Sequence, residues 1–219
     1  MADQILIIGL GQFGMALARA LCEKGAEVIA ADYKKLLVDE ASLFVTEAVV
    51  LDATSEAEVA RLEPAKRDSC VCAIGDESRE ASIICTAILK QMGAPRIVAR
   101  AGDLIHKRIL LLVGAHQVVN PEEEFGKRFA NQILYRHVIA DASIGEDLHL
   151  TEICVQPSMI GKTLIELALP KRFGIMIAAI RRGDDRKLMQ PLPTEKLQNH
   201  DNLIIVSNES SIQRFVKGV

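Results

Sequence analysis

Six short apolar runs, separated by segments with helical periodicity, fill the first 120 residues and limit the fold more than any other feature of the sequence. The runs cover residues 5–10, 28–31, 48–51, 70–74, 97–99 and 117–119. Between the first two runs, Phe13, Leu17 and Leu21 recur every four residues, which is the spacing of a helix stripe. Strands that alternate with helices pair in parallel through right-handed crossovers. The pattern therefore predicts an α/β fold whose N-lobe, residues 1–120, is a doubly wound parallel-sheet Rossmann domain.

A glycine motif directly follows the first apolar run and precedes the first helical stripe. The motif consists of Gly9, Leu10, Gly11, Gln12, Phe13 and Gly14. In a strand–turn–helix context, Gly9 permits a tight turn, Gly11 lets the backbone approach a pyrophosphate, and Gly14 permits close packing of helix on strand. The phosphate then meets free N–H groups at the positive end of the helix dipole. We predict that a nucleotide binds here; the alternative is a tight turn that serves packing only.

An aspartate, Asp32, ends the second apolar run, 18 residues after the last glycine of the motif. A carboxylate at this place accepts hydrogen bonds from both ribose hydroxyls and repels a 2′-phosphate, which favours NAD over NADP. Lys34 and Lys35 lie close enough in sequence to weaken that preference. Asp32 suits the ribose of ATP, ADP or AMP equally well, because these share the adenosine half. The alternative is an aspartate that only forms a turn.

The ends of the other strands supply further candidates, because ligands bind at the carboxyl edge of a doubly wound sheet. The candidate cofactor-binding residues beyond those already named are Tyr33, Asp52, Ala53, Thr54, Ile74, Gly75 and Arg100. Asp52 ends the third run, where an adenine ring would lie, and the small loop at Gly75 leaves room for a ribose. Arg100 follows the fifth run and could reach a phosphate. For each of them the alternative is an ordinary residue at the end of a strand.

Several patterns that enzymes of this fold class need are missing from the sequence. Neither Tyr33 nor Tyr135 has a lysine four residues later, and no Gly-x-Ser-x-Gly elbow occurs. The five histidines are scattered, and the five cysteines include no Cys-x-x-Cys pair. A nucleotide fold without acid, base or nucleophile favours a sensor, so we predict no catalytic residue and no enzyme. The net charge of -3, with both signs interspersed, argues against nucleic acid as a partner.

The pattern changes at Pro121. Residues 122–135 are predicted to form one longer helix with Phe125, Phe129 and Ile133 on one face, which could pack on a partner subunit or on its own domain. Strands at 148–155, 175–180 and 203–206 and helices at 163–169 and 210–216 then predict a small α+β C-lobe. The predicted domains are residues 1–120, a crossover and dimerisation helix at 121–137, and the C-lobe at 138–219. Apolar stretches such as 109–113 are too short to span a bilayer, so work at a membrane requires docking.

At this point the sequence resembles the RCK domains (regulators of potassium conductance), in particular the TrkA- and KtrA-like cytosolic subunits of Trk and Ktr potassium uptake systems. The matching stretches are IIGLGQFG (7–14), VLDAT (50–54), IVARA (97–101) and GAHQVVNPEEEFG (114–126). The tail from residue 147 to 219 is similar to the C-terminal RCK lobe, including Pro157, GKTL (161–164), Pro191 and DNL (201–203). The resemblance spans nearly the whole chain and is more specific than the glycine motif alone.

The resemblance implies a regulatory subunit that senses NAD(H) or an adenine nucleotide (ATP, ADP or AMP). It implies homodimers formed through the 121–137 helix, assembled into a ring (a tetramer or octamer) under an integral membrane potassium-translocating subunit of the TrkH or KtrB type. The location implied is cytoplasmic, peripheral on the inner face of the cell membrane. Glu122 matches an acid that helps hold a divalent cation (Mg²⁺ or Ca²⁺) near the terminal phosphate; its alternative is an acid that faces the helix dipole.

Two departures from the family pattern and two competing functions stay open at this point. Ktr relatives carry Arg where this chain has Gln12, which puts ATP-specific switching in doubt and is closer to the Trk branch, which accepts NAD(H) as well. Pro170 and Met176 stand where relatives that bind cyclic di-AMP use Arg and Asn, so we predict no tight site for that ligand. The competing functions are an NAD-dependent oxidoreductase and a regulator of a different ion channel or antiporter.

Overall fold

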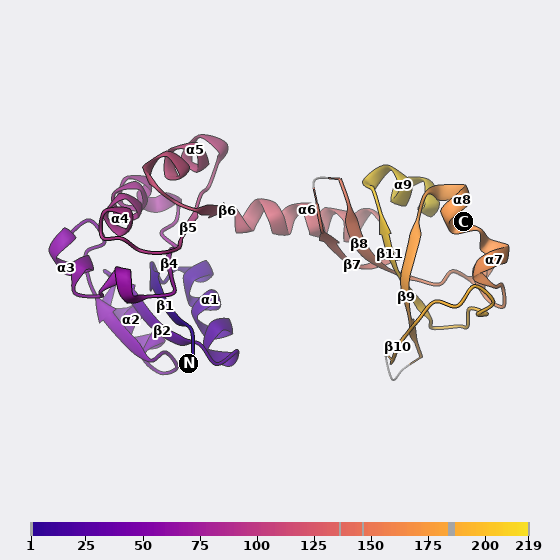
Figure 1. Cartoon of the computed structure of the whole chain (residues 1–219), viewed down its shortest axis with the longest axis horizontal. Coiled ribbons are helices and arrows are strands. Elements are labelled where there is room, and N and C mark those ends of the chain that lie inside the picture. The colour runs from indigo at the N-terminus through magenta and orange to yellow at the C-terminus, as the bar shows by residue number, and fades with distance from the viewer. Residues whose placement is uncertain (1, 136, 146, 184–186, 219) are drawn as a thin grey trace. The chain divides into compact units, whose positions relative to one another are not determined.

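The computed structural model describes residues 2–135, 137–145, 147–183 and 187–218. The chain divides into two compact units, Met1–Glu122 and Glu123–Val219, which are drawn in Figure 1. Each unit has its own sheet and its own buried core, and each is described by itself below.

The first unit is built on a six-stranded parallel sheet. Its strands are β1 (Gln4–Ile8), β2 (Glu27–Asp32), β3 (Glu47–Val50), β4 (Ser69–Cys72), β5 (Ile97–Arg100) and β6 (Gln117–Val119). Their order in the sheet is β3-β2-β1-β4-β5-β6. The order reverses between β1 and β4, and in such sheets the crevice at the carboxyl ends of the strands beside this reversal is the usual ligand site.

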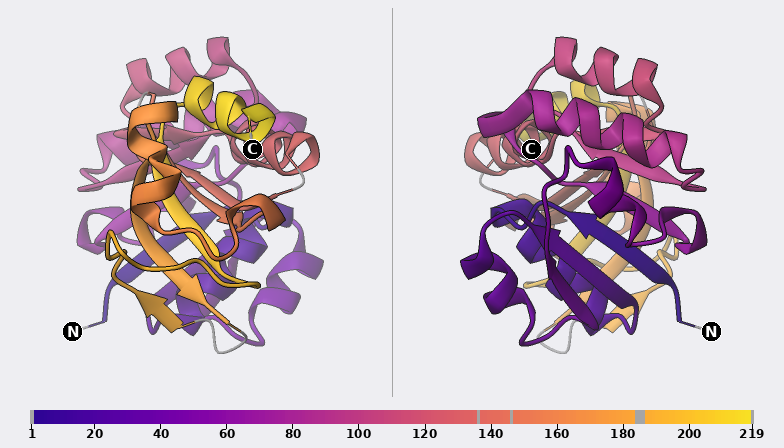
Figure 2. Two further views of the ribbon diagram at one scale, coloured as in Figure 1. Left: turned by 90° about the vertical axis from the view of Figure 1, so that its right-hand side faces the viewer. Right: turned by 90° about the vertical axis from the view of Figure 1, so that its left-hand side faces the viewer.

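Helices cover both faces of this sheet, as the doubly wound prediction requires. They are α1 (Gln12–Glu23), α2 (Lys35–Ala41), α3 (Glu56–Ala60), α4 (Arg79–Gln91) and α5 (Leu104–Val113), with short 3-10 turns at Pro64–Lys66 and Asp76–Ser78. Along β1, Leu6 and Ile8 pack in one cluster with α3, α4 and α5, whereas Ile7 packs in the other with α1 and α2. Successive side chains of a strand point to opposite faces, so a strand buried on both faces has to be apolar throughout. The right-hand view of Figure 2 faces this unit.

The second unit contains a five-stranded antiparallel sheet, which confirms the predicted α+β C-lobe. Its strands are β7 (Val138–Ser143), β8 (His149–Cys154), β9 (Met176–Arg182), β10 (Lys187–Met189) and β11 (Asn202–Ser207), in the order β10-β9-β11-β8-β7. Its helices are α6 (Pro121–Leu134), which begins in the first unit, α7 (Leu164–Leu167), α8 (Leu169–Phe173) and α9 (Glu209–Gly218), with a 3-10 turn at Pro157–Met159. The sequence analysis missed the two edge strands, β7 and β10.

The helix predicted at 163–169 is confirmed in part, because α7 lies within this range, whereas α8, which contains Pro170, was not predicted. Thr163 begins α7 with a capping box: its hydroxyl accepts from the amide of Glu166, whose carboxylate accepts from the amide of Thr163. Ala168 then takes a left-handed conformation, with φ +45°, that ends α7. Pro170 follows in the first turn of α8, where its lack of an N–H does no harm. The sequence Gly183-Asp184-Asp185 also predicts a turn after the strand at 175–180, and this turn lies partly outside the described residues.

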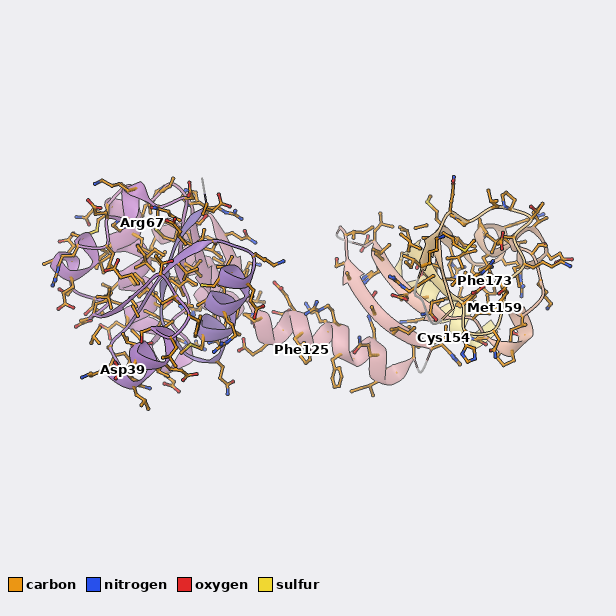
Figure 3. The ribbon with its side chains drawn as sticks, turned by 90° about the horizontal axis from the view of Figure 1, so that it is seen from below. Asp39, Arg67, Phe125, Cys154, Met159 and Phe173 are labelled. Atoms are coloured by element: carbon orange, nitrogen blue, oxygen red, sulfur yellow. The ribbon has the colours of Figure 1, made fainter. Side chains whose placement is uncertain are left out.

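The apolar stripe of α6 stays exposed in the single chain. Phe125, Phe129 and Ile133 are 57%, 47% and 66% exposed, and no α6 residue is buried among those that the structure describes. The Phe125 and Phe129 rings stack with their centroids 5.5 Å apart, and Figure 3 labels Phe125 on the helix. Of the two roles predicted for this stripe, packing on its own domain finds no support in the described residues.

The core of the second unit depends on an aromatic pair between α8 and α9. The rings of Phe173 and Phe215 meet edge to face with centroids 5.4 Å apart, and Phe215 is 1% exposed. We expect Phe215→Ala to lower the free energy of unfolding of this unit by about 3–5 kcal/mol, because it removes a buried ring and leaves a cavity. Urea unfolding followed by circular dichroism measures this loss. Leu188→Ala, at a 59% exposed position on β10, is the control, and an equal loss there would contradict the assignment.

Candidate functional site

The loop between β1 and α1 lies against the loop after β4, and this packing requires glycine at Gly9 in the loop and at Gly14 in the first turn of α1. Gly9 has φ +101°, and a Cβ on it would lie 2.8 Å from the amide nitrogen of Ile74. A Cβ on Gly14 would lie 1.9 Å from the carbonyl oxygen of Gly9. Real Cβ atoms do not come this close to backbone, so both positions exclude every other residue without a shift of the chain. These contacts set the shape of the turn and bring α1 onto the sheet.

The middle glycine of the motif is different, because the chain itself does not need it. Gly11 is exposed, has an ordinary φ of -62°, and no described atom lies within 4 Å of the place where its Cβ would be. It is the N-cap of α1 and supplies no side-chain hydrogen bond to the first turn. A helix N-terminus of this kind attracts anions through its amides and its dipole. The glycine at this position leaves space for a group that is not part of the chain.

Asp32 ties the glycine loop to the neighbouring strand. It ends β2 and is 7% exposed. Its Oδ2 accepts a hydrogen bond of 2.6 Å from the amide of Leu10, and its Oδ1 accepts one of 2.8 Å from the amide of Lys34. A carboxylate has about four acceptor positions, so capacity for further donors remains. The structure therefore places the predicted ribose acceptor beside the loop and adds a role in holding that loop.

Four of the other candidates meet on the opposite side of the loop, around Arg100. A Cβ on Gly75 would lie 2.9 Å from Nη1 of Arg100, so the guanidinium rests where a side chain would otherwise be. The Arg100 Cζ lies 6.0 Å from the ring centroid of Phe13, and its Nη2 forms an ion pair with Oε1 of Glu122. The Arg100 side chain is only 18% exposed. A mostly buried guanidinium of this kind needs an anionic partner, and Glu122 provides it.

The candidates after β3 form a turn of their own. Oδ1 of Asp52 accepts hydrogen bonds from the amide of Thr54 (2.9 Å) and from its hydroxyl (2.7 Å), which lower the pKa of Asp52 below its usual value. The Glu58 carboxylate accepts from the amide of Asp52, while the Ser55 hydroxyl accepts from the amide of Glu58 at 3.4 Å. Ser55 therefore caps the N-terminus of α3, while the Glu58 carboxylate binds the amide of Asp52 and not that of Ser55. Among the described residues, no hydrogen bond joins Asp52 or Thr54 to the glycine loop.

The remaining candidates lie at the margin of the site. Tyr33 is 68% exposed, and the ammonium of Lys34 lies 5.2 Å from its ring centroid. Ala53 and Ile74 are partly buried and pack against the core. Gln12 is the exposed first residue of α1. Their positions at the carboxyl edge agree with the prediction, but their contact with a ligand stays a prediction.

Glu122 was predicted to help hold a divalent cation, and this stays a prediction. It is the second residue of α6, so its carboxylate also lies near the positive end of the helix dipole. In the part of the chain that is described, no three His, Cys, Asp or Glu side chains converge as a metal site would require. The ion pair with Arg100 was not foreseen. Arg100 pairs with Val119 where β5 and β6 lie side by side, and this pairing brings Glu122, three residues after Val119, close to Arg100. Only the register of the two strands reveals this proximity.

Comparison with known proteins supplies the family. The TrkA-N domain matches residues 5–121, and the TrkA-C domain matches residues 150–217. The chain is 35% identical over 219 residues to the Ktr system potassium uptake protein C of Bacillus subtilis (strain 168), covering all of this chain and 98% of that protein. It is 33% identical to the Ktr system potassium uptake protein A of Vibrio alginolyticus, over 99% of this chain and 97% of that one. The chain belongs to the TrkA-N/TrkA-C (RCK) family of potassium uptake regulators.

Solved structures agree with this RCK assignment at the level of the fold. The GsuK channel matches all of this chain with a TM-score of 0.68 at 20% identity, and a GsuK channel bound to NAD matches with a TM-score of 0.66. This RCK chain spans 40% of the length of those channel chains. The predicted family, the Rossmann N-lobe with its α+β C-lobe, and a regulatory rather than enzymatic role are all confirmed. No helix in the described residues is long and apolar enough to cross a bilayer.

The two kinds of glycine in the motif predict losses of stability of different size. We expect Gly14→Ala to lower the free energy of unfolding by about 1–3 kcal/mol, because its Cβ overlaps the Gly9 carbonyl. Gly11→Ala should cost about 1 kcal/mol or less, since its Cβ points into open space and only the N-cap preference is lost. Urea unfolding of both variants checks the comparison. Equal losses would show that the loop is not packed as described.

Proposed function

We propose that this RCK protein binds NAD(H) or an adenine nucleotide at the carboxyl edge of its N-lobe sheet and thereby gates a membrane potassium-translocating subunit. One observation carries the proposal: Gly11 leaves open space at the N-terminus of α1, directly beside the Asp32 carboxylate. Anion-binding amides and a sugar-binding acid at this spacing suit the phosphates and ribose of a nucleotide.

The ligand range follows from the groups that surround the loop. Asp32 suits any adenosine ribose with free hydroxyls, so it supports NAD(H), ATP, ADP and AMP alike. Gln12 is neutral, whereas Arg100 places one positive charge on the β4 and β5 side of the loop. The family fold also takes a nucleotide in a solved relative, a GsuK channel bound to NAD. A divalent cation held by Glu122 would share that carboxylate with Arg100, which pairs with its Oε1.

The proposed assembly uses the 121–137 segment as a crossover and dimerisation helix. Its exposed stripe of Phe125, Phe129 and Ile133 supports a homodimer, because contiguous apolar surface of this kind is normally covered. Dimers would assemble into a ring, a tetramer or octamer, on the cytoplasmic face of the membrane. The Ktr relatives support a KtrB-like membrane subunit as the partner; a different channel or antiporter is the second candidate.

The decisive test of nucleotide binding is Gly11→Val. A valine side chain at this position would occupy the space proposed for the phosphates, so we expect affinity for NAD⁺, NADH, ATP, ADP and AMP to fall at least about tenfold, which is 1.4 kcal/mol or more. Isothermal titration calorimetry of the wild type and the variant, with and without Mg²⁺, measures this. Thermal melts must show that the fold is retained. Unchanged affinity in a folded variant would place the nucleotide site elsewhere.

The transport role is tested in the same variant. In cells whose potassium uptake depends on this protein and its membrane subunit, Gly11→Val should give uptake that no longer responds to nucleotide. Copurification with a KtrB-like subunit, compared with an unrelated channel or antiporter, identifies the partner. Hydride transfer from NADH to any small carbonyl substrate would restore the oxidoreductase alternative.

The proposed dimer is tested on the α6 stripe. We expect Phe129→Asp to convert dimers into monomers, because it puts a charge in the middle of an apolar interface. Sedimentation velocity measures the change. Lys127→Asp changes charge on the same helix at a 74% exposed side chain that pairs with Glu123 of that helix, so it should leave the oligomer intact. Dissociation by both variants alike, or by neither, would contradict the role of the stripe.

A further inference from the structure

We propose that Glu122 and the terminal phosphate of a bound nucleotide compete for the guanidinium of Arg100. The ion pair would close when no phosphate is present and open when one arrives. The inference rests on the proposed function, because it needs a nucleotide in the N-lobe. It adds a mechanism by which nucleotide binding changes the start of α6.

Arg100 is held where both partners can reach it. Its guanidinium lies over Gly75, where a Cβ would come within 2.9 Å of Nη1, and its Cζ lies 6.0 Å from the ring of Phe13 in the first turn of α1. Gly75 follows Ile74, whose amide nitrogen would lie 2.8 Å from a Cβ built on Gly9 of the loop. A phosphate chain that extends from the N-terminus of α1 toward the β4 end therefore runs toward Arg100. Guanidinium binds phosphate with paired, charge-assisted hydrogen bonds.

The existing partner of Arg100 is easy to displace. The Glu122 side chain is 61% exposed, so water can solvate its carboxylate once the pair breaks. Arg100, at 18% exposed, cannot be solvated as readily and needs an anion in either state. A terminal phosphate carries more charge than a carboxylate and three acceptor oxygens, which favours the exchange. The Arg100 guanidinium then pairs with the phosphate, whereas the Glu122 carboxylate is left unpaired and solvated by water.

The consequence falls on the start of α6. Glu122 is the second residue of that helix and the last residue of the first compact unit. While the pair is closed, the first turn of α6 is tied to the end of β5 through Arg100. Once a phosphate takes the guanidinium, this tie is lost. Nucleotides with a terminal phosphate near Arg100 would release the turn, whereas adenosine would leave it closed.

The experiment compares two neighbouring glutamates. Glu122→Gln removes the competitor, and Glu123→Gln makes the same change in charge one residue later, where the carboxylate pairs with Lys127 in the same helix. Calorimetry in EDTA with adenosine, ADP and ATP excludes any effect of a divalent cation. We expect Glu122→Gln to bind ADP and ATP about 3- to 10-fold more tightly than the wild type, with adenosine unchanged. Glu123→Gln should match the wild type for all three ligands.

A second variant ties the gain to Arg100. In an Arg100→Gln background, adding Glu122→Gln should no longer raise affinity for ADP or ATP, because the contested cation is gone. Hydrogen exchange supplies an independent readout: amides in the first turn of α6 should exchange faster in the wild type with ADP than without it. Thermal melts confirm that each variant is folded.

The outcomes separate the inference from the proposed function. Wild-type protein that binds nucleotide, with no gain in Glu122→Gln, overturns the competition and leaves the nucleotide site standing. If affinity for ADP and ATP rises equally in Glu123→Gln, or still rises in the Arg100→Gln background, the competition is also overturned. The cause would then be the removal of a negative charge and not the release of Arg100. Absence of any nucleotide binding by the wild type overturns both.

Discussion

The close approach of two backbones at Gly9 and Gly14 is the constraint on which the rest of the N-lobe depends. Neither position has room for a Cβ. Because both residues are glycine, the turn after β1 packs directly against the Ile74 backbone on one side and the start of α1 on the other. That packing fixes the direction of α1 and leaves Gly11 at its exposed end. The features relevant to a ligand, an open helix N-terminus and a nearby acid, are thus results of how the chain packs against itself.

Asp32 makes this loop rigid before any ligand arrives. Its two hydrogen bonds, from Leu10 and Lys34, hold the glycine loop on β2 in a buried place. A loop that is already ordered does not lose conformational freedom on binding, which favours affinity. The same carboxylate is the one expected to meet a ribose, so structural and ligand roles overlap in one residue. A substitution there reports both effects together, whereas Gly11 separates them.

The sequence was sufficient to predict elements whose structure follows from burial alone. It was insufficient to predict features that depend on the register of neighbouring strands. The central strands of the N-lobe are apolar throughout because both faces are covered, so their pattern is hard to mistake. β7 is an edge strand that buries only Val138 and Asp141, and its sequence lacks the alternation that marks a strand. The pair between Arg100 and Glu122 spans 22 residues and exists only because β5 lies beside β6. No spacing rule along the chain could reveal it.

The chemistry of the site suits a regulator because its charged groups are committed to partners rather than poised to move protons. The Asp32 carboxylate accepts hydrogen bonds from backbone amides, hydrogen bonds from Thr54 lower the pKa of Asp52, and Arg100 forms an ion pair with Glu122. Groups of this kind change the binding energies of anions and are poor acids and bases near neutral pH. Coupling between such a site and α6 is an equilibrium effect and therefore reciprocal. If nucleotide changes the affinity of a partner that binds α6, that partner must change the affinity for nucleotide by the same factor.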